Sequence, residues 1–262
     1  MSMIDFTTTD GVAEVVLNNP QAMNALDPQA LADLDAAYAE ATRLAAEGTV
    51  RALILRGEGR GFCAGRNIAG LNPADDDATY YLDQVVTPVL KNMTQVPVPT
   101  FAAVQGACLG VGLGLAIATD IVYVADTAKI GSPFANLGAT LDSGGHFLFA
   151  ERLGAHRAMD LIVTGELMSG ADAVRAGLFS RSVPADELLE FTRAKAQAAA
   201  RGATLAFRAS REQIRLIREQ GLGLWESIAR ENIAQGELCA SADYHEGFAA
   251  FNAKRPPVFH GR

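Results

Sequence analysis

Residues 100–131 read TFAAVQGACLGVGLGLAIATDIVYVADTAKIG, and this stretch predicts much of the fold. It contains a short apolar run (Phe101–Val104), a glycine-rich turn, a helical segment and a second apolar run (Ile121–Ala125). No charged residue occurs up to Thr119, so we expect burial. A helix that begins just after Gly110 directs free N–H groups at a ligand, and these groups favour negative charge. The stretch therefore predicts a site for an anion or a developing oxyanion.

The glycine-rich turn does not match the phosphate-binding fingerprints of nucleotide-binding proteins. A dinucleotide fingerprint that starts at Gly110-x-Gly112 would need a third glycine where Leu115 stands. The turn contains no Gly-Lys-Ser/Thr, so it is not a P-loop either. The glycines alone fit close packing of a helix on a sheet equally well, and that alternative stays open at this point.

A second glycine-rich loop follows another buried strand, which we predict at Ala52–Arg56. Its sequence is Gly61-Phe62-Cys63-Ala64-Gly65-Arg66-Asn67. Two such turns at the ends of neighbouring strands place two backbone N–H donors around one oxygen. Each donor contributes roughly 3–4 kcal/mol to the stabilisation of a developing negative charge. The two loops together predict an oxyanion hole.

The composition is that of a globular protein, with 262 residues, 49% of them hydrophobic and 20% charged. The net charge of −8 argues against nucleic acid and anionic membranes as partners. No apolar run approaches the roughly 20 residues that span a bilayer, and the first residues, MSMIDFTTTD, do not resemble a signal peptide. Three widely spaced cysteines fit neither a disulfide framework nor a metal motif. We therefore expect a cytoplasmic protein without a metal.

Strands alternate with helices along most of the chain, which predicts an α/β fold. A hairpin is expected around Asp10-Gly11, and a helix from Pro28 capped by Asp27. A last short strand is expected at Arg181–Val183. From Ala185 onward the periodicity is helical almost to the end, so we expect an all-helical appendage.

Several motifs resemble those of the crotonase (enoyl-CoA hydratase/isomerase) superfamily, in the same order and spacing. They are GFCAGRN, GACLGVGLGLAIATDIVYVADTAKIG and LGATLDSGGHFLFAERLG, and the tail ends YHEGFAAFNAKRPPVF as in many members. The resemblance implies a spiral of ββα units over residues 1–195. It implies a helical region over residues 196–262 that forms a homotrimer or homohexamer and helps to close the site. It also implies an acyl-CoA thioester as substrate, so that coenzyme A enters only with the substrate and no cofactor is permanently bound.

The resemblance also assigns roles to particular residues. The two oxyanion-hole donors fall on the backbone N–H groups of Arg66 and Val111, where the family more often has small residues. Lys254 lies in the tail, which in such proteins often helps to hold the nucleotide of the coenzyme. The substrate contacts that the resemblance implies are Met23, Ala25, Ala64, Gly65, Asn67, Ile68, Gly110, Phe134, Leu137 and Lys254.

The acidic residues indicate the reaction. Hydratases of this family use two glutamates, and those positions match Gly114 and Phe134, so both acids are absent. One carboxylate remains, Asp142, immediately before Ser143-Gly144-Gly145. An aspartate at this point resembles the isomerases of phenylacetate degradation, in which a single acid moves a proton between carbons. We therefore predict an enoyl-CoA isomerase of aromatic or fatty acid breakdown, acting on a double bond or a ring epoxide.

Four alternatives stay open from the sequence. An enoyl-CoA hydratase would need a further catalytic group, and a non-catalytic CoA-binding scaffold would need none. A 4-chlorobenzoyl-CoA dehalogenase would use Asp142 as a nucleophile, but its tryptophan–histidine pair would fall on Val86 and Thr87. The structural alternative for Asp142 is the N-cap of the following helix, a role that is compatible with catalysis. The acidic residues Asp75–Asp77 are expected to form a solvated loop.

Overall fold

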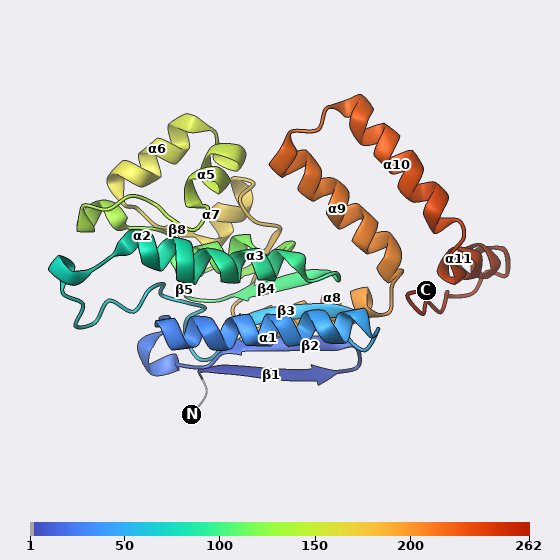
Figure 1. Ribbon diagram of the computed structural model, residues 1–262, viewed down its shortest axis with the longest axis horizontal. Helices are drawn as coiled ribbons and strands as arrows, with labels where there is room; N and C mark the ends of the chain where they lie inside the picture. Colours follow the sequence, from blue (N-terminus) through green and yellow to red (C-terminus); the bar gives the residue numbers. More distant parts are fainter. Residues whose placement is uncertain (1–2) are drawn as a thin grey trace.

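The computed structural model describes residues 3–262 and is built around a six-stranded sheet (Figure 1). The strand order is β1-β2-β3-β4-β6-β9. The first two strands form the predicted antiparallel hairpin, and all other neighbours pair in parallel. The strands span Ile4–Thr9 (β1), Val12–Leu17 (β2), Ala52–Gly57 (β3), Thr100–Val104 (β4), Ile121–Ala125 (β6) and Arg181–Val183 (β9).

A second, three-stranded sheet has the order β5-β7-β8. It contains Ala107–Leu109 (β5), Lys129–Gly131 (β7) and Met168–Ser169 (β8). The chain passes from β4 directly to β5 and from β6 directly to β7, so it alternates between the two sheets. The sequence predicts only a turn between the apolar run and the helix, and strand β5 lies within that stretch. Its three residues are strand because β7 pairs with them, which the local sequence does not reveal.

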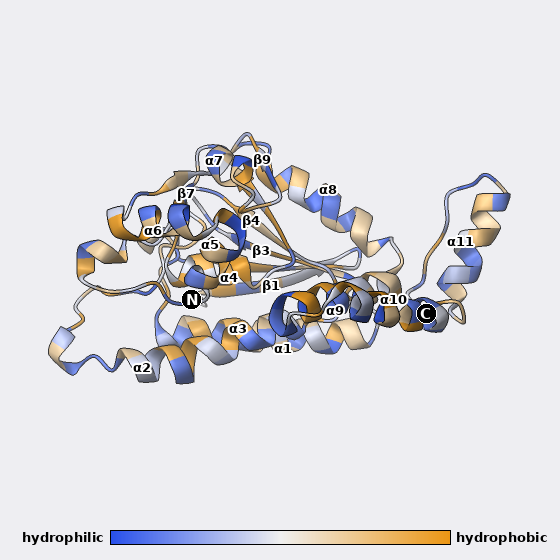
Figure 2. Cartoon of the chain, turned by 90° about the horizontal axis from the view of Figure 1, so that it is seen from above, coloured by the Kyte–Doolittle hydropathy of each residue, from blue (hydrophilic) through white to orange (hydrophobic). Residues whose placement is uncertain are grey.

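Helices cover both faces of the large sheet. The predicted helix after Asp27 is confirmed as α1 (Pro28–Ala46), and the Asp27 side chain accepts a hydrogen bond from the Ala30 N–H. It packs beside α3 (Thr87–Gln95), whereas α8 (Leu188–Ala200) covers the opposite face (Figure 2). The remaining helices of the core are α2 (Ala78–Tyr80), a π-helical turn η3 (Tyr81–Val86), α4 (Val111–Ile117), α5 (Gly145–Leu153), α6 (Ala155–Thr164) and α7 (Gly170–Arg175). Short 3-10 turns occur at Pro20–Ala22 (η1), Pro73–Asp75 (η2) and Phe134–Leu137 (η4).

The helical region consists of α9 (Thr204–Gln220), α10 (Leu224–Leu238) and α11 (Ala242–Asn252). The predicted boundary between residues 195 and 196 falls inside α8, which packs on β3 and β4, so this region begins after α8. The Arg51 guanidinium joins it to the core through the carbonyls of Gly202 (2.6 Å) and Phe259 (2.8 Å). Figures 1 and 2 show α11 at the end of the molecule farthest from the sheets. Within residues 3–262, no helix has the length and apolar character needed to cross a membrane.

Candidate functional site

The two predicted glycine-rich loops lie side by side, each following the carboxyl end of its strand. The Cys63 N–H donates to the Ala107 carbonyl (2.8 Å), and the Leu109 N–H donates to the Cys63 carbonyl (3.0 Å). These bonds form a short parallel pair between the loop after β3 and strand β5. The two loops are therefore held against each other by their own backbones.

The backbone N–H groups of Arg66 and Val111 are both free. Leu26 bonds on either side of Arg66, to the Gly65 carbonyl and from the Asn67 N–H (both 2.8 Å), so the Arg66 N–H points away from Leu26. Val111 is the first residue of α4, where the N–H has no partner within the helix. Over residues 3–262, neither N–H makes a hydrogen bond.

The two free N–H groups belong to loops in direct contact. A methyl group placed on Gly65, whose φ is +93°, would lie 3.6 Å from the Val111 nitrogen and 2.8 Å from the Leu109 carbonyl oxygen. Only glycine permits both this backbone angle and this close approach. The arrangement brings together the two donors that the sequence predicts for an oxyanion hole.

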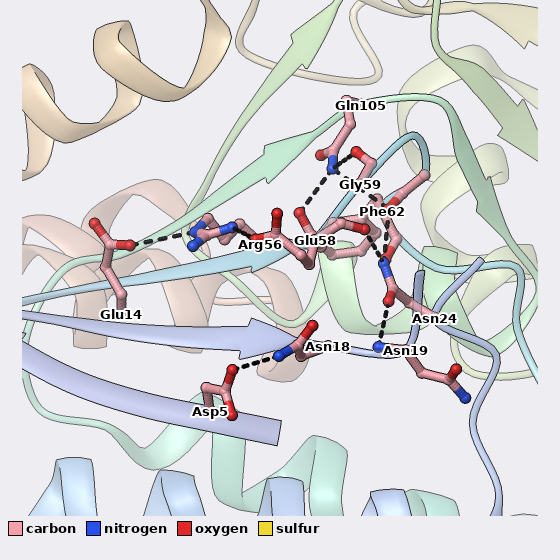
Figure 3. Close-up of polar contacts among 12 residues, drawn as sticks. Asp5, Glu14, Asn18, Asn19, Asn24, Arg56, Glu58, Gly59, Phe62 and Gln105 are labelled. Carbon is pink, nitrogen blue, oxygen red and sulfur yellow. Dashed lines mark hydrogen bonds and ion pairs between the residues drawn. The ribbon is translucent and has the colours of Figure 1, made fainter. Parts of the chain in front are cut away.

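Asn24, which the sequence pattern does not single out, holds the loop after β3 in place through hydrogen bonds (Figure 3). Its buried side-chain amide donates to the carbonyls of Gly61 (2.8 Å), Glu58 (3.0 Å) and Phe62 (3.1 Å). Its side-chain oxygen accepts from the Asn19 N–H at 2.8 Å. The sequence around an asparagine in a turn does not indicate that its side chain bonds to residues far away along the chain. Its network holds the loop rigid, as a preorganised site requires.

Asp142 lies in the segment between η4 and α5 and does not cap the helix. The N-cap of α5 is Gly144, and no side chain bonds there, so the structural alternative for Asp142 is wrong. Its Oδ1 atom is buried and has no hydrogen-bond partner among residues 3–262. Burial raises the pKa of this carboxyl above its ordinary value, and the Ser143 hydroxyl and the nearby Arg66 guanidinium oppose that shift. The Oδ1 atom is therefore available to a substrate proton.

The two positions that match the hydratase glutamates are occupied differently here. A methyl group on Gly114 would lie only 2.4 Å from the Ser143 Cβ, so Ser143 fills the space that a longer side chain would need. Phe134 packs its ring against Gly110, where a methyl group would meet its Cζ atom at 2.8 Å. Both positions thus lack an acid, and Gly114 also lacks the room for one.

The other predicted substrate contacts fall into three groups. Ala64 and Met23 are half-buried and joined by a hydrogen bond (Ala64 N–H to Met23 carbonyl, 3.0 Å), and Ala25 lies in the same segment. Asn67 and Ile68 continue the first loop and are exposed. Leu137 ends η4 and is 64% exposed. All except Leu137 adjoin the loop that carries the Arg66 N–H.

Lys254 is not brought to this site within one chain. It follows α11 and is exposed, at the opposite end of the molecule from α4 (Figure 2). A role for Lys254 in holding the coenzyme therefore requires another copy of the chain and stays a prediction.

Cys63 and Cys108 are buried, free thiols beside the two loops. Burial raises the pKa of the Cys63 thiol to about 12, so it is no nucleophile at neutral pH. Both side chains belong to the hydrophobic core. Within residues 3–262, no three His, Cys, Asp or Glu side chains are grouped so as to hold a metal ion.

The Arg66 side chain connects the first loop to the acidic segment. It forms a bidentate ion pair with Asp76 (2.7 and 2.9 Å) and lies over the Tyr81 ring, 4.0 Å from its centroid. The prediction of a merely solvated loop is therefore wrong for Asp76, because its partner is ten residues away and not visible in the local pattern.

We expect Arg66→Ala to lower kcat less than about tenfold, because the substitution keeps the backbone N–H and removes a guanidinium that is paired with Asp76 and lies over the Tyr81 ring. Steady-state kinetics with an acyl-CoA substrate would measure this. Arg43→Ala, which removes an exposed ion pair on α1, is the matched control. A loss of a hundredfold or more would contradict a role for Arg66 through its backbone alone.

Comparisons with known proteins agree with this geometry. The family model described as enoyl-CoA hydratase/isomerase matches residues 7–262. A probable enoyl-CoA hydratase of Rhodobacter capsulatus is 34% identical over 99% of this chain and 98% of its own. The 1,2-epoxyphenylacetyl-CoA isomerase of Escherichia coli is 32% identical over 96% of each. The crystal structure of an enoyl-CoA hydratase from Bacillus anthracis has a TM-score of 0.90 at 28% identity, and covers 99% of this chain and 100% of that one.

The alternation between two sheets, the paired glycine-rich loops and these matches define a crotonase fold. The chain belongs to the enoyl-CoA hydratase/isomerase family.

Proposed function

We propose that this protein is an enoyl-CoA isomerase that uses Asp142 as its single acid–base group. The observation that supports this most directly is the Asp142 carboxyl, whose buried Oδ1 has no partner within residues 3–262, in a site where Gly114 has no room for a second acid. The free N–H groups of Arg66 and Val111 would receive the thioester oxygen. A hydratase-like pair of acids is not needed for this chemistry.

The reaction moves one proton and changes no other atom. The Asp142 carboxylate takes a proton from a carbon of the enoyl chain, and the electron pair of that C–H bond moves toward the thioester carbonyl. The two N–H donors stabilise the resulting enolate oxygen. The protonated Asp142 then returns the proton to another carbon of the conjugated system, and the double bond shifts. Substrate and product have the same mass.

Hydration is the second candidate, because most of the relatives carry names that say hydratase. It would require a group that activates water as well as a proton donor. A non-catalytic CoA-binding scaffold is less well supported, because it gives no reason to bury Oδ1 of Asp142, which has no partner within residues 3–262 and does not cap α5.

We further propose that coenzyme A enters only as part of the substrate and that the protein acts in the cytoplasm as a homotrimer or homohexamer. The helical region supports the oligomer, since Trp225 and Phe251 are 79% and 82% exposed. A hollow of about 430 Å³ between α9 and α11 is lined by apolar side chains that include Phe248 and Phe259. Light scattering should give three or six times the chain mass of 27.6 kDa, and a monomer would contradict the proposal.

The reaction is tested with purified protein and, separately, a 3-enoyl-CoA and a 2-enoyl-CoA, by chromatographic separation of the products and measurement of their masses. We expect an isomer of unchanged mass. Gain of one water by the 2-enoyl-CoA, without isomerisation, would replace the proposal with hydration. Binding of both thioesters without any product would favour the scaffold.

A further inference from the structure

The hydroxyl of Tyr81 is buried at the site without a partner. Tyr81 begins the π-helical turn η3, is 6% exposed, and places its ring under the Arg66 guanidinium. Its hydroxyl makes no hydrogen bond within residues 3–262. The same is true of Oδ1 of Asp142 and Oγ of Ser143. A buried hydroxyl without a partner is uncommon in proteins, so the Tyr81 hydroxyl beside Arg66 is available to a molecule that binds at this site.

The charges of Arg66 and Asp142 both affect the pKa of Tyr81. Burial raises the pKa of Tyr81 to about 12, the Arg66 guanidinium opposes this shift, and the Asp142 carboxylate adds to it. The phenol therefore keeps its proton at neutral pH and acts as a hydrogen-bond donor. The donor stands beside the residue that carries one proposed oxyanion donor and near the proposed base.

A purely hydrocarbon acyl chain would offer no hydrogen-bond acceptor to the Tyr81 hydroxyl. A buried hydroxyl that faces only hydrocarbon loses its hydrogen bond to water and gains nothing in return. An acceptor oxygen on the acyl group would restore that bond. Sites built around such a donor discriminate against ligands that lack the oxygen.

We propose that Tyr81 donates a hydrogen bond to an oxygen of the acyl group, so that the protein selects acyl-CoA thioesters carrying a carbonyl, hydroxyl or epoxide oxygen beyond the thioester. The inference rests on the proposed function, since it assumes that the acyl chain enters between Arg66 and Asp142. It adds a substrate class and a specificity-determining residue to that site.

Binding of unreactive thioesters tests this inference without any turnover. Isothermal titration calorimetry would compare hexanoyl-CoA with 4-oxohexanoyl-CoA and 5-oxohexanoyl-CoA, which differ from it by one carbonyl oxygen in place of two hydrogens. We expect the protein to bind at least one oxo compound roughly three- to tenfold more tightly than hexanoyl-CoA, the range typical of one net hydrogen bond. Tyr81→Phe should abolish or reverse that preference.

Tyr38→Phe is the matched control, because Tyr38 also has a buried hydroxyl without a partner but lies on α1. The Tyr38→Phe variant should prefer the oxo compound to the same degree as the unchanged protein. Thermal melting shows whether each variant is folded. Equal binding of all three thioesters by the unchanged protein would overturn the inference, as would a preference that survives Tyr81→Phe. In either case hexanoyl-CoA still binds and the proposed function stands, whereas failure to bind any thioester would remove both.

Discussion

Replacement of Asp142 by asparagine is expected to lower kcat for isomerisation by roughly 10²–10⁴, the range typical of a lost acid–base group. Asparagine keeps the size and shape of the side chain but takes no proton. The two backbone donors are unchanged, so the KM for the thioester should change much less than kcat. Product masses and steady-state rates with a 3-enoyl-CoA would measure the effect.

The same substitution should leave the melting temperature unchanged or raise it. The folded pKa of Asp142 lies above its unfolded value, so ionisation at neutral pH opposes folding, and this cost disappears as the pH falls through the folded pKa. Asparagine removes the cost at neutral pH. For a purely structural aspartate the opposite is expected, with lost stability and little loss of rate.

Asp83→Asn is the matched control for both measurements, because Asp83 is an exposed aspartate on the neighbouring η3 turn. It should leave rate and stability unchanged. Full activity of Asp142→Asn would show that another group moves the proton and would direct attention back to hydration.

The sequence predicts those parts of the site that depend on local patterns. The glycine-rich loops around Gly65 and Gly110 are visible because glycine is needed for their backbone angles, +93° and +51° in φ. The sequence indicates a buried helix after Gly110, because no charged residue occurs between Gly110 and Thr119. These two features predict two backbone donors around one oxygen, and the resemblance to the crotonase superfamily assigns the donors to Arg66 and Val111.

Contacts between distant segments could not be predicted in this way. Asn24 reaches carbonyls 34–38 residues away, and Ser143 fills the space beside Gly114. The side-chain partner of Arg66 is Asp76, and Tyr81 is buried where η3 packs on neighbouring helices. Each of these contacts depends on which elements lie next to each other in the folded chain. The periodicity and spacing of residues in the sequence do not specify those neighbours.

Replacement of Val111 by proline tests the oxyanion hole directly, because it removes the N–H while a residue of similar size stays at this buried position. Proline is well tolerated as the first residue of a helix, where the N–H has no helical partner. We expect kcat to fall roughly 10²–10³-fold, the typical cost of one lost donor. Kinetics with a 3-enoyl-CoA would measure this, and circular dichroism would confirm that the variant is folded.

Ala155→Pro separates the lost donor from the effect of proline itself. Ala155 is exposed, is the first residue of α6 and follows a glycine, Gly154, just as Val111 follows Gly110. Its N–H makes no hydrogen bond within residues 3–262, and it lies on a different helix from the proposed donor. This control should keep its activity and fold. If Val111→Pro is folded and equally active, the thioester oxygen is not held at the start of α4, and the Arg66 N–H must act with some other donor.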